Sequence, residues 1–191
     1  MQVIKVERST AETQVVVELR PFGERDLVVD TGVPFFDHML HALLFHGGFG
    51  ATITARGDIE VDDHHTVEDV GIVLGQTLWR VHEERGPLAR FGSAVVPMDD
   101  ALAETVVDLG GRPFMVFTAE FPQAYAGRFD LALVREFFQS LATHSRANIH
   151  VHGRYGVNGH HLAEAMFKSC GRALAQACTP VDSLRSTKGS L

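Results

Sequence analysis

The sequence is short of positive charge, of cysteine and of long hydrophobic runs. Its 17 Lys and Arg residues stand against 24 Asp and Glu, a formal net charge of −7 at pH 7. This balance argues against a nucleic-acid-binding protein, because such proteins gain affinity by neutralising phosphates. No apolar run approaches the length of a membrane span, and the N-terminus lacks the apolar region of a secretory leader. We therefore expect a cytoplasmic protein that does not bind membranes.

The two cysteines, Cys170 and Cys178, fall in one predicted helix. At this spacing along a helix the two sulfur atoms are too far apart to form a disulfide. We expect both to be buried, reduced thiols.

Histidine, in contrast, is abundant, with 11 residues in a chain of 191. Its imidazole is the commonest metal ligand and titrates near neutral pH. The chain is 45% hydrophobic, which is enough for one domain, or two fused halves, with a full core. The positions of the histidines therefore carry most of the functional information.

Hydrophobic periodicity predicts an alternation of strands and helices. Strands are expected at residues 3–8, 14–19, 51–55, 92–97, 101–109, 114–121 and 148–152. Helices are expected at residues 34–46, 63–84, 130–143 and 160–177. The first helix has Pro34 at its start and Gly47 and Gly48 at its end, an asymmetry typical of helices.

The second half of the chain repeats the first. At an offset of 98, residues 36–40 align with 134–138, His46 with His144 and 51–54 with 149–152; after a two-residue gap, 64–68 align with 160–164 and Gly75 with Gly171. We expect an α+β fold of two pseudo-symmetric halves, each a small, mostly antiparallel sheet with two helices on one face. The expected domain spans 1–191, with repeats at about 1–90 and 91–180 and a polar tail at 179–191 that is predicted to be disordered.

Each repeat carries a His-His-x-x-Glu motif at the start of a predicted helix. The motifs are His64, His65 and Glu68, and His160, His161 and Glu164. Three side chains at this spacing cannot all face one ion. We expect the second histidine and the glutamate, three residues apart, to bind one ion, and the first histidine to face the ion of the other half. His38 and Glu136, which align in the two halves, are further candidate ligands.

A single His-His doublet would more often be exposed or cap a helix, but two with the same spacing favour a metal site. Imidazole and carboxylate donors without a thiolate suit Mn²⁺, Fe²⁺, Co²⁺ or Zn²⁺, and the sequence does not rank these ions. The His-Glu-x-x-His pattern of zinc proteases is missing. His46 and His144 either line the site or are cations that the C-terminal end of a helix favours.

The few basic residues include Lys168, one helical turn beyond Glu164 and so beside the expected metal site. A pocket with a metal and cations suits a small, phosphorylated substrate. A two-metal phosphoesterase would need the same residue types, and a His-rich storage protein would need the metal alone. The α+β repeat also occurs in RNA-binding folds, which the acidic charge disfavours.

Five segments resemble signatures of the imidazoleglycerol-phosphate dehydratase family. They are residues 35–40, 62–69, 137–141, 160–168 and 186–189, and the resemblance runs from about residue 12 to the C-terminus. It implies a lyase of histidine biosynthesis that converts imidazole glycerol phosphate to imidazole acetol phosphate and water. It also implies two Mn²⁺ per active site and a homo-oligomer of 24 subunits with active sites between subunits.

The resemblance further assigns roles to individual residues. It implies His38, His65, Glu68 and His160 on one manganese, and His64, His161 and Glu164 on the other, with Glu136 where the family usually has a fourth histidine. The implied substrate-binding residues are Glu12, His38, His46, Arg90, Arg112, Lys168, Ser186 and Lys188. The implied catalytic residues are Glu12, His65 and Glu164, with Glu12 as the acid–base.

Overall fold

The computed structural model describes residues 3–183 as two four-stranded sheets, four helices and a small hairpin. The first half contains strands β1 (Ile4–Ser9), β2 (Thr13–Arg20), β3 (Leu27–Asp30) and β4 (Gly50–Gly57), and helices α1 (Pro34–Gly47) and α2 (His64–Glu84). The second half contains β5 (Phe91–Met98), β6 (Ala101–Asp108), β7 (Phe114–Thr118) and β10 (Asn148–Tyr155), and helices α3 (Leu133–His144) and α4 (Gly159–Ala177). The short strands β8 (Tyr125–Ala126) and β9 (Phe129–Asp130) pair with each other.

The two sheets have the same topology. Their strand orders are β1-β2-β4-β3 and β5-β6-β10-β7, with one parallel pair in each, β3 with β4 and β7 with β10. The other neighbouring pairs are antiparallel. The expected fold class, α+β with two pseudo-symmetric halves, is confirmed.

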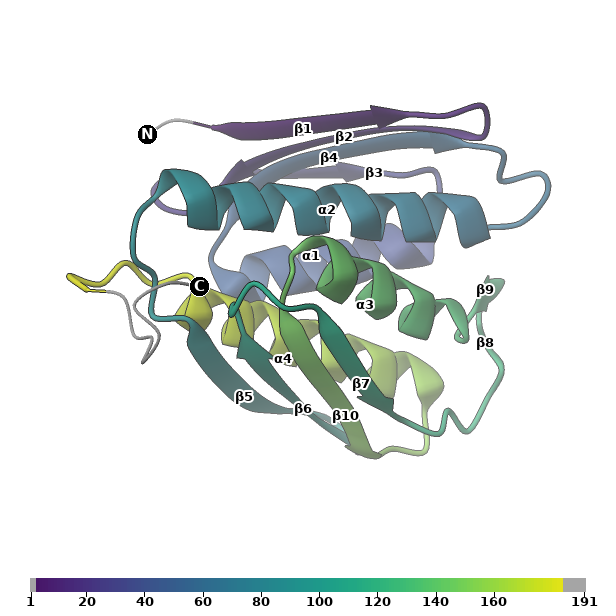
Figure 1. Ribbon diagram of the computed structural model, residues 1–191. Helices are drawn as coiled ribbons and strands as arrows, with labels where there is room; N and C mark the ends of the chain where they lie inside the picture. The colour runs from purple at the N-terminus through teal and green to yellow at the C-terminus, as the bar shows by residue number, and fades with distance from the viewer. Residues whose placement is uncertain (1–2, 184–191) are drawn as a thin grey trace.

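The sheets form the outer layers and the helices lie between them (Figure 1). Alternation in β2 turns Val15, Val17 and Leu19 inward, where each is no more than 1% exposed. Helices α1 and α2 cover the first sheet, and α3 and α4 cover the second. Helices of different halves then pack on one another, α1 on α4 and α2 on α3, so the core joins both halves.

Two glycines allow these helix pairs to approach closely. A Cβ atom at Gly171 of α4 would lie 2.0 Å from the carbonyl oxygen of Leu43 on α1, and one at Gly75 of α2 would lie 2.8 Å from that of Leu141 on α3. Gly75 aligns with Gly171 in the sequence repeat, and Leu43 with Leu141. The two helix contacts are therefore equivalent, and each one joins the two halves.

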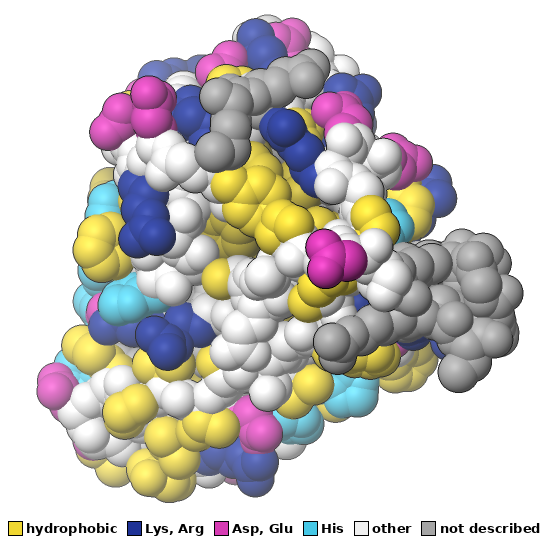
Figure 2. Space-filling view, turned by 90° about the vertical axis from the view of Figure 1, so that its left-hand side faces the viewer, with side chains coloured by type: hydrophobic (Ala, Val, Ile, Leu, Met, Phe, Trp, Pro, Cys, Tyr) yellow, Lys and Arg dark blue, Asp and Glu magenta, His cyan; other side chains and the backbone are white. Residues whose placement is uncertain are grey.

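All four helices begin at the same end of the molecule, the right-hand end in Figure 1. Figure 2 views the opposite end, where hydrophobic side chains occupy a hollow with Lys and Arg side chains at its border. A pocket of about 300 Å³ near the ends of α1 and α4 is lined by residues including Phe22, Arg25, Phe49 and Ala175. The His-His doublets begin α2 and α4, and so lie far from this pocket.

The structure corrects several expected element boundaries. Strands β3, β8 and β9 were not expected, because they are too short to show periodicity. Helix α3 begins at Leu133 instead of residue 130, because β9 occupies residues 129–130, and β7 ends at Thr118 instead of 121.

The beginning of the expected disordered tail is held by backbone hydrogen bonds. The N–H of Ala89 donates to the carbonyl of Thr179 (2.7 Å), and the N–H of Val181 donates to that of Pro87 (3.0 Å). The prediction of disorder is therefore wrong for these residues, and the tail beyond residue 183 lies outside the described residues. Within residues 3–183, no helix combines the length and the apolar character needed to cross a membrane.

Candidate metal centre

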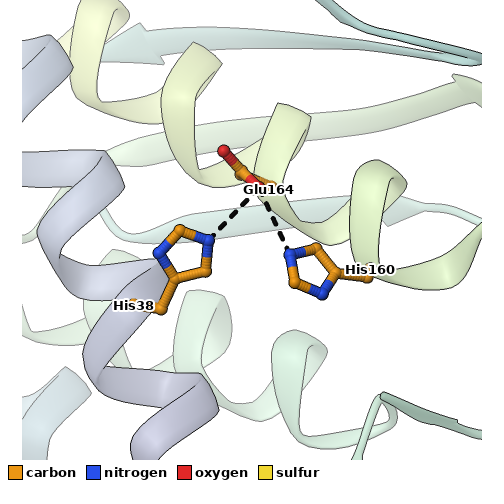
Figure 3. A group of neighbouring side chains, drawn as sticks. All are labelled: His38, His160 and Glu164. Carbon is orange, nitrogen blue, oxygen red and sulfur yellow. Dashed lines mark hydrogen bonds and ion pairs between the residues drawn. The ribbon is translucent and has the colours of Figure 1, made fainter. Parts of the chain in front are cut away.

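Three predicted ligands meet where α1 packs on α4. The Oε2 atom of Glu164 lies 3.3 Å from Nε2 of His38 and 3.3 Å from Nε2 of His160 (Figure 3). One ligand atom from each of the three side chains lies within 4.8 Å of the other two. His38 comes from the first half and the other two from the second, so this cluster exists only because the halves pack together.

Local hydrogen bonds fix the helix starts that carry this cluster. Asp37 accepts hydrogen bonds from the backbone N–H (2.9 Å) and the hydroxyl (2.6 Å) of Thr31, which anchors the first turn of α1 beside His38. The Asn158 side chain caps α4 by accepting the backbone N–H of His160 at 2.9 Å. Both imidazoles therefore project from anchored helix starts.

Lys168 holds the other oxygen of Glu164. Its Nζ lies 2.6 Å from Oε1, and Glu164 is only 7% exposed. Burial acts to raise the pKa of Glu164, but the hydrogen bond and charge of Lys168, helped by His38, outweigh it and lower the pKa. The carboxylate is thus charged at neutral pH, and the expected place of Lys168 beside the cluster is confirmed.

The first half carries a looser counterpart of this cluster. His64 and Glu68 on α2 approach to 3.9 Å between Nε2 and Oε2, and both are partly exposed. Glu136, which aligns with His38, lies on α3, where the neighbouring Phe137 has its carbonyl oxygen against Gly71 of α2. The Oε1 atom of Glu136 is 3.5 Å from the Arg135 guanidinium. Helix α3 therefore packs on α2 in the first half of this arrangement, as α1 packs on α4 in the second.

The contacts within each motif differ from the pairing that was expected for bound ions. The first histidine of each motif, not the second, faces the glutamate, so the pairs are His64 with Glu68 and His160 with Glu164, four residues apart. Residues four apart on a helix differ by about 400° in direction, which is about 40° from a full turn, whereas residues three apart differ by about 300°, about 60° from a full turn. Side chains four apart therefore point in more similar directions. The split of the ligands between two ions that the resemblance implies stays a prediction. Within one chain, Glu164 rather than Glu68 lies beside His38 and His160.

The second histidines of the doublets, His65 and His161, contact loop carboxylates instead. Nδ1 of His65 is 3.1 Å from both oxygens of Asp58 and 3.9 Å from Oε2 of Glu12. Nδ1 of His161 is 2.6 Å from Oδ1 of Asp100. The hydrogen bonds to Asp58 and Asp100 raise the pKa of their imidazoles, and the bond to His161 lowers the pKa of Asp100 to about 2.

Asp58 and Asp100 are not among the site residues expected from the sequence. A signal for Asp100 was available in the repeat, since it directly precedes β6 as Glu12 directly precedes β2. Asp58 has no such marker, because only the fold of the loop before α2 brings it to His65.

Arg90 and Arg112, in contrast to Lys168, do not lie at the cluster. The Arg90 guanidinium binds Asp108 (Nε to Oδ1, 2.6 Å), and its backbone N–H donates to Ala177 at the far end of α4. Ala177 lies thirteen residues beyond Glu164, or about 20 Å at the rise of an α-helix. Arg112 is exposed, and its carbonyl accepts a hydrogen bond from Asn148.

The remaining predicted substrate-binding residues have different outcomes. His46 lies near Lys168. Desolvation, together with the charges of Lys168 and Arg172, lowers the pKa of His46. Ser186 and Lys188 lie outside the described residues. Nδ1 of His144, the residue that aligns with His46, donates to the carbonyl oxygen of Ser140 (3.0 Å), the contact of a helix C-terminal residue.

A pocket of about 530 Å³ adjoins the cluster at His160. Phe35 at the start of α1 and Arg128 in the β8–β9 turn also line it. The Phe35 ring packs edge-on against the His160 imidazole, with centroids 5.1 Å apart. A planar ligand next to these histidines would find an aromatic wall and a cation.

The donor atoms at the α1–α4 contact suit a divalent ion. Two imidazole nitrogens and a charged, buried carboxylate converge at distances that one ion could bridge. Fold and site thus define an α+β protein of two matched halves, with a His and Glu cluster at the junction between them. The model of the imidazoleglycerol-phosphate dehydratase family matches residues 31–174, and the chain belongs to this family, whose members are lyases of histidine biosynthesis.

Individual relatives agree over nearly the full chain. The imidazoleglycerol-phosphate dehydratase of Acidithiobacillus ferrooxidans is 46% identical over 191 residues, which cover 98% of this chain and 96% of the relative. That of an Anaeromyxobacter species is 49% identical, covering 97% and 90%. The crystal structure of the Staphylococcus aureus enzyme superposes with a TM-score of 0.85 at 36% identity, covering 94% of this chain and all of that one. The Pyrococcus furiosus structure gives 0.86 at 38% identity, covering 97% and 100%.

Proposed function

We propose that this chain is a metal-dependent dehydratase that converts imidazole glycerol phosphate to imidazole acetol phosphate and water. Membership of the family supports the reaction. The observation that carries the metal dependence is the convergence of His38, His160 and Glu164, whose ligand atoms lie within 4.8 Å of one another.

We propose Mn²⁺ as the ion, with two ions per active site. His38, His160 and Glu164 would hold one of them. His64, Glu68 and Glu136 would hold the other, because they occupy the same positions in the repeat. Nitrogen and oxygen donors without thiolate suit Mn²⁺.

The ligand sets of the two ions would be completed by His65 and His161 of another copy of the chain. Within one chain their imidazoles contact Asp58 and Asp100 rather than the glutamates of their own motifs. Arg90, which the resemblance assigns to the phosphate, is hydrogen-bonded to Ala177, and Ala177 lies about 20 Å along α4 from Glu164. Both facts favour a homo-oligomer with active sites between subunits, and the proposed number of 24 subunits rests on the family resemblance.

The proposed chemistry divides between positioning and proton transfer. Bound metal ions would act as Lewis acids that bind and polarise the imidazole ring of the substrate. Lys168, with Arg90, Arg112, Ser186 and Lys188, would bind the phosphate and supply remote binding energy for positioning. Glu12 sits exposed on the β1–β2 turn, 3.9 Å from His65, and would move the proton of the carbon next to the leaving hydroxyl.

We further propose that the reaction takes place in the cytoplasm. The two cysteines are free in the structure, which suits a reducing compartment. The proposed partners are the phosphorylated imidazole substrate and other copies of the chain, with no nucleic acid and no membrane.

An assay of metal-reconstituted protein tests the proposal. Protein stripped by chelation and reloaded with Mn²⁺ should form imidazole acetol phosphate, and elemental analysis of the same sample should find bound manganese. Release of inorganic phosphate instead of a ketone would identify a phosphoesterase. Tight metal binding without turnover of this substrate would indicate a storage protein.

A further inference from the structure

Each second histidine of the doublets has one ring nitrogen against a loop aspartate. Nδ1 of His65 faces both carboxylate oxygens of Asp58 at 3.1 Å, and Nδ1 of His161 faces Oδ1 of Asp100 at 2.6 Å. A carboxylate can only accept, so each Nδ1 carries the hydrogen. The other nitrogen, Nε2, is then unprotonated in the neutral ring and able to bind a metal. Ligating histidines usually have such a partner on their second nitrogen. Nε2 of His161 also has Oδ2 of the exposed Asp99 3.7 Å away.

The two aspartates reach their histidines from different parts of the fold. Asp58 directly follows β4, in the loop before α2. Asp100 lies in the β5–β6 turn, and its Oδ2 accepts the backbone N–H groups of Val157 (2.6 Å) and Asn158 (3.0 Å) just before α4. One oxygen thus fixes the loop and the other aims the imidazole.

The repeat shows why this difference matters. Asp100 directly precedes β6 as Glu12 directly precedes β2, so the two carboxylates occupy equivalent hairpin positions. In the second half this position orients the imidazole at 2.6 Å. In the first half Asp58 does so, and Glu12 stays at 3.9 Å from His65 with its side chain 56% exposed.

We propose that Asp58 and Asp100 are positioning residues that fix the ring nitrogen with which His65 and His161 bind metal. In the first half this role of Asp58 leaves Glu12 available for proton transfer. The inference rests on the proposed function, since it needs both histidines to be metal ligands. It adds Asp58 and Asp100 to the proposed site. It also gives the equivalent hairpin carboxylates different roles, proton transfer for Glu12 and positioning for Asp100.

The test measures metal affinity rather than turnover. Metal-stripped Asp58→Ala, Asp58→Asn and wild-type protein are titrated with Mn²⁺, and the free ion is followed by electron paramagnetic resonance. We expect Asp58→Ala to bind Mn²⁺ about 10–100-fold more weakly, the usual cost of losing such a partner. Asp58→Asn keeps an acceptor oxygen and should recover most of the affinity. Asp100→Ala should weaken binding as well, with lowered thermal stability from the lost loop bonds.

Two controls separate positioning from general effects. Glu12→Gln, at the equivalent of Asp100, should leave the Mn²⁺ affinity unchanged. Asp30→Asn, which breaks the exposed ion pair with Arg56, should do the same. The d–d absorption of the Co²⁺-loaded protein should change in Asp58→Ala and not in the controls.

The outcomes also separate this inference from the proposed function. If wild-type protein forms the ketone with Mn²⁺ while Asp58→Ala and Asp100→Ala bind the ion as tightly as wild type, the positioning role is wrong and the dehydratase stands. If wild-type protein binds no Mn²⁺, the metal dependence fails, and the positioning role fails with it.

Discussion

The ammonium of Lys168 lies 2.6 Å from one oxygen of Glu164, while the other oxygen of that carboxylate faces His38 and His160. A single buried carboxylate therefore joins the cation of the site to its imidazoles. Two properties depend on this contact: the charge of Glu164 and the binding of an anionic substrate.

Lys168→Met should weaken both properties. Without the lysine, burial dominates, so the pKa of Glu164 rises and the carboxylate takes up a proton at a higher pH than in wild type. The acid limb of the profile of activity against pH should move to higher pH. The KM for the phosphorylated substrate should rise about 10–100-fold, the worth of one charge-assisted hydrogen bond.

Lys168→Arg serves as the matched variant for this test, because it keeps the charge. The arginine variant should bring the acid limb back to its wild-type pH more fully than it brings the KM back to its wild-type value. An unshifted acid limb in Lys168→Met would mean that Lys168 does not control the ionisation of Glu164.

The sequence predicts most of the fold and the residue types of the site, because both halves of the repeat contain the same helices and the same motif. Periodicity locates the helices, and the two motifs identify the ligand types. The orientation of the His65 side chain could not be predicted from the sequence. Whether His64 or His65 faces Glu68 depends on side-chain rotamers. In addition, Asp58 reaches His65 only through the fold of a loop. The joining of His38 to Glu164 depends on α1 packing on α4, a contact between residues 126 positions apart.

Glu12→Gln should reduce turnover by orders of magnitude and leave metal content and substrate affinity nearly unchanged. The amide cannot accept the proton, but it has almost the same shape and keeps the exposed position on the β1–β2 turn. Single-turnover kinetics and elemental analysis of the same preparation measure these quantities. Wild-type turnover would remove Glu12 from proton transfer.

Gly171→Ala should destabilise the protein although alanine favours helices. Alanine in a helix is better than glycine by about 1 kcal/mol. Here its Cβ would lie 2.0 Å from the Leu43 carbonyl oxygen, so α1 and α4 must separate, at a cost of about 1–3 kcal/mol. Gly75→Ala, at 2.8 Å from Leu141, should cost less.

Thermal unfolding at one protein concentration checks this order of stabilities. Arg172→Ala, at the exposed position next to Gly171, is the control and should shift the midpoint little. A midpoint for Gly171→Ala at or above that of wild type would contradict the close helix contact.

Cys170 and Cys178 should resist alkylation in the folded protein. Both are buried, and burial raises the pKa of each thiol to about 12, so the reactive thiolate is scarce at pH 8. Iodoacetamide should add nothing to native protein and two groups to protein unfolded in guanidinium, as read by mass spectrometry. Rapid modification of the native protein would show that this part of the core opens.

Glu136 offers a test of the second proposed ion, because it aligns with His38 but supplies a carboxylate. Glu136→Ala should weaken the binding of one of the two Mn²⁺ ions and leave the ion at His38, His160 and Glu164 in place. Elemental analysis after dialysis against a weak chelator should then find about half of the wild-type metal. Glu136→His should restore the full amount and shift preference from Mn²⁺ towards Co²⁺ or Zn²⁺, because imidazole is a softer donor than carboxylate. Full metal retention in Glu136→Ala would exclude this carboxylate as a ligand.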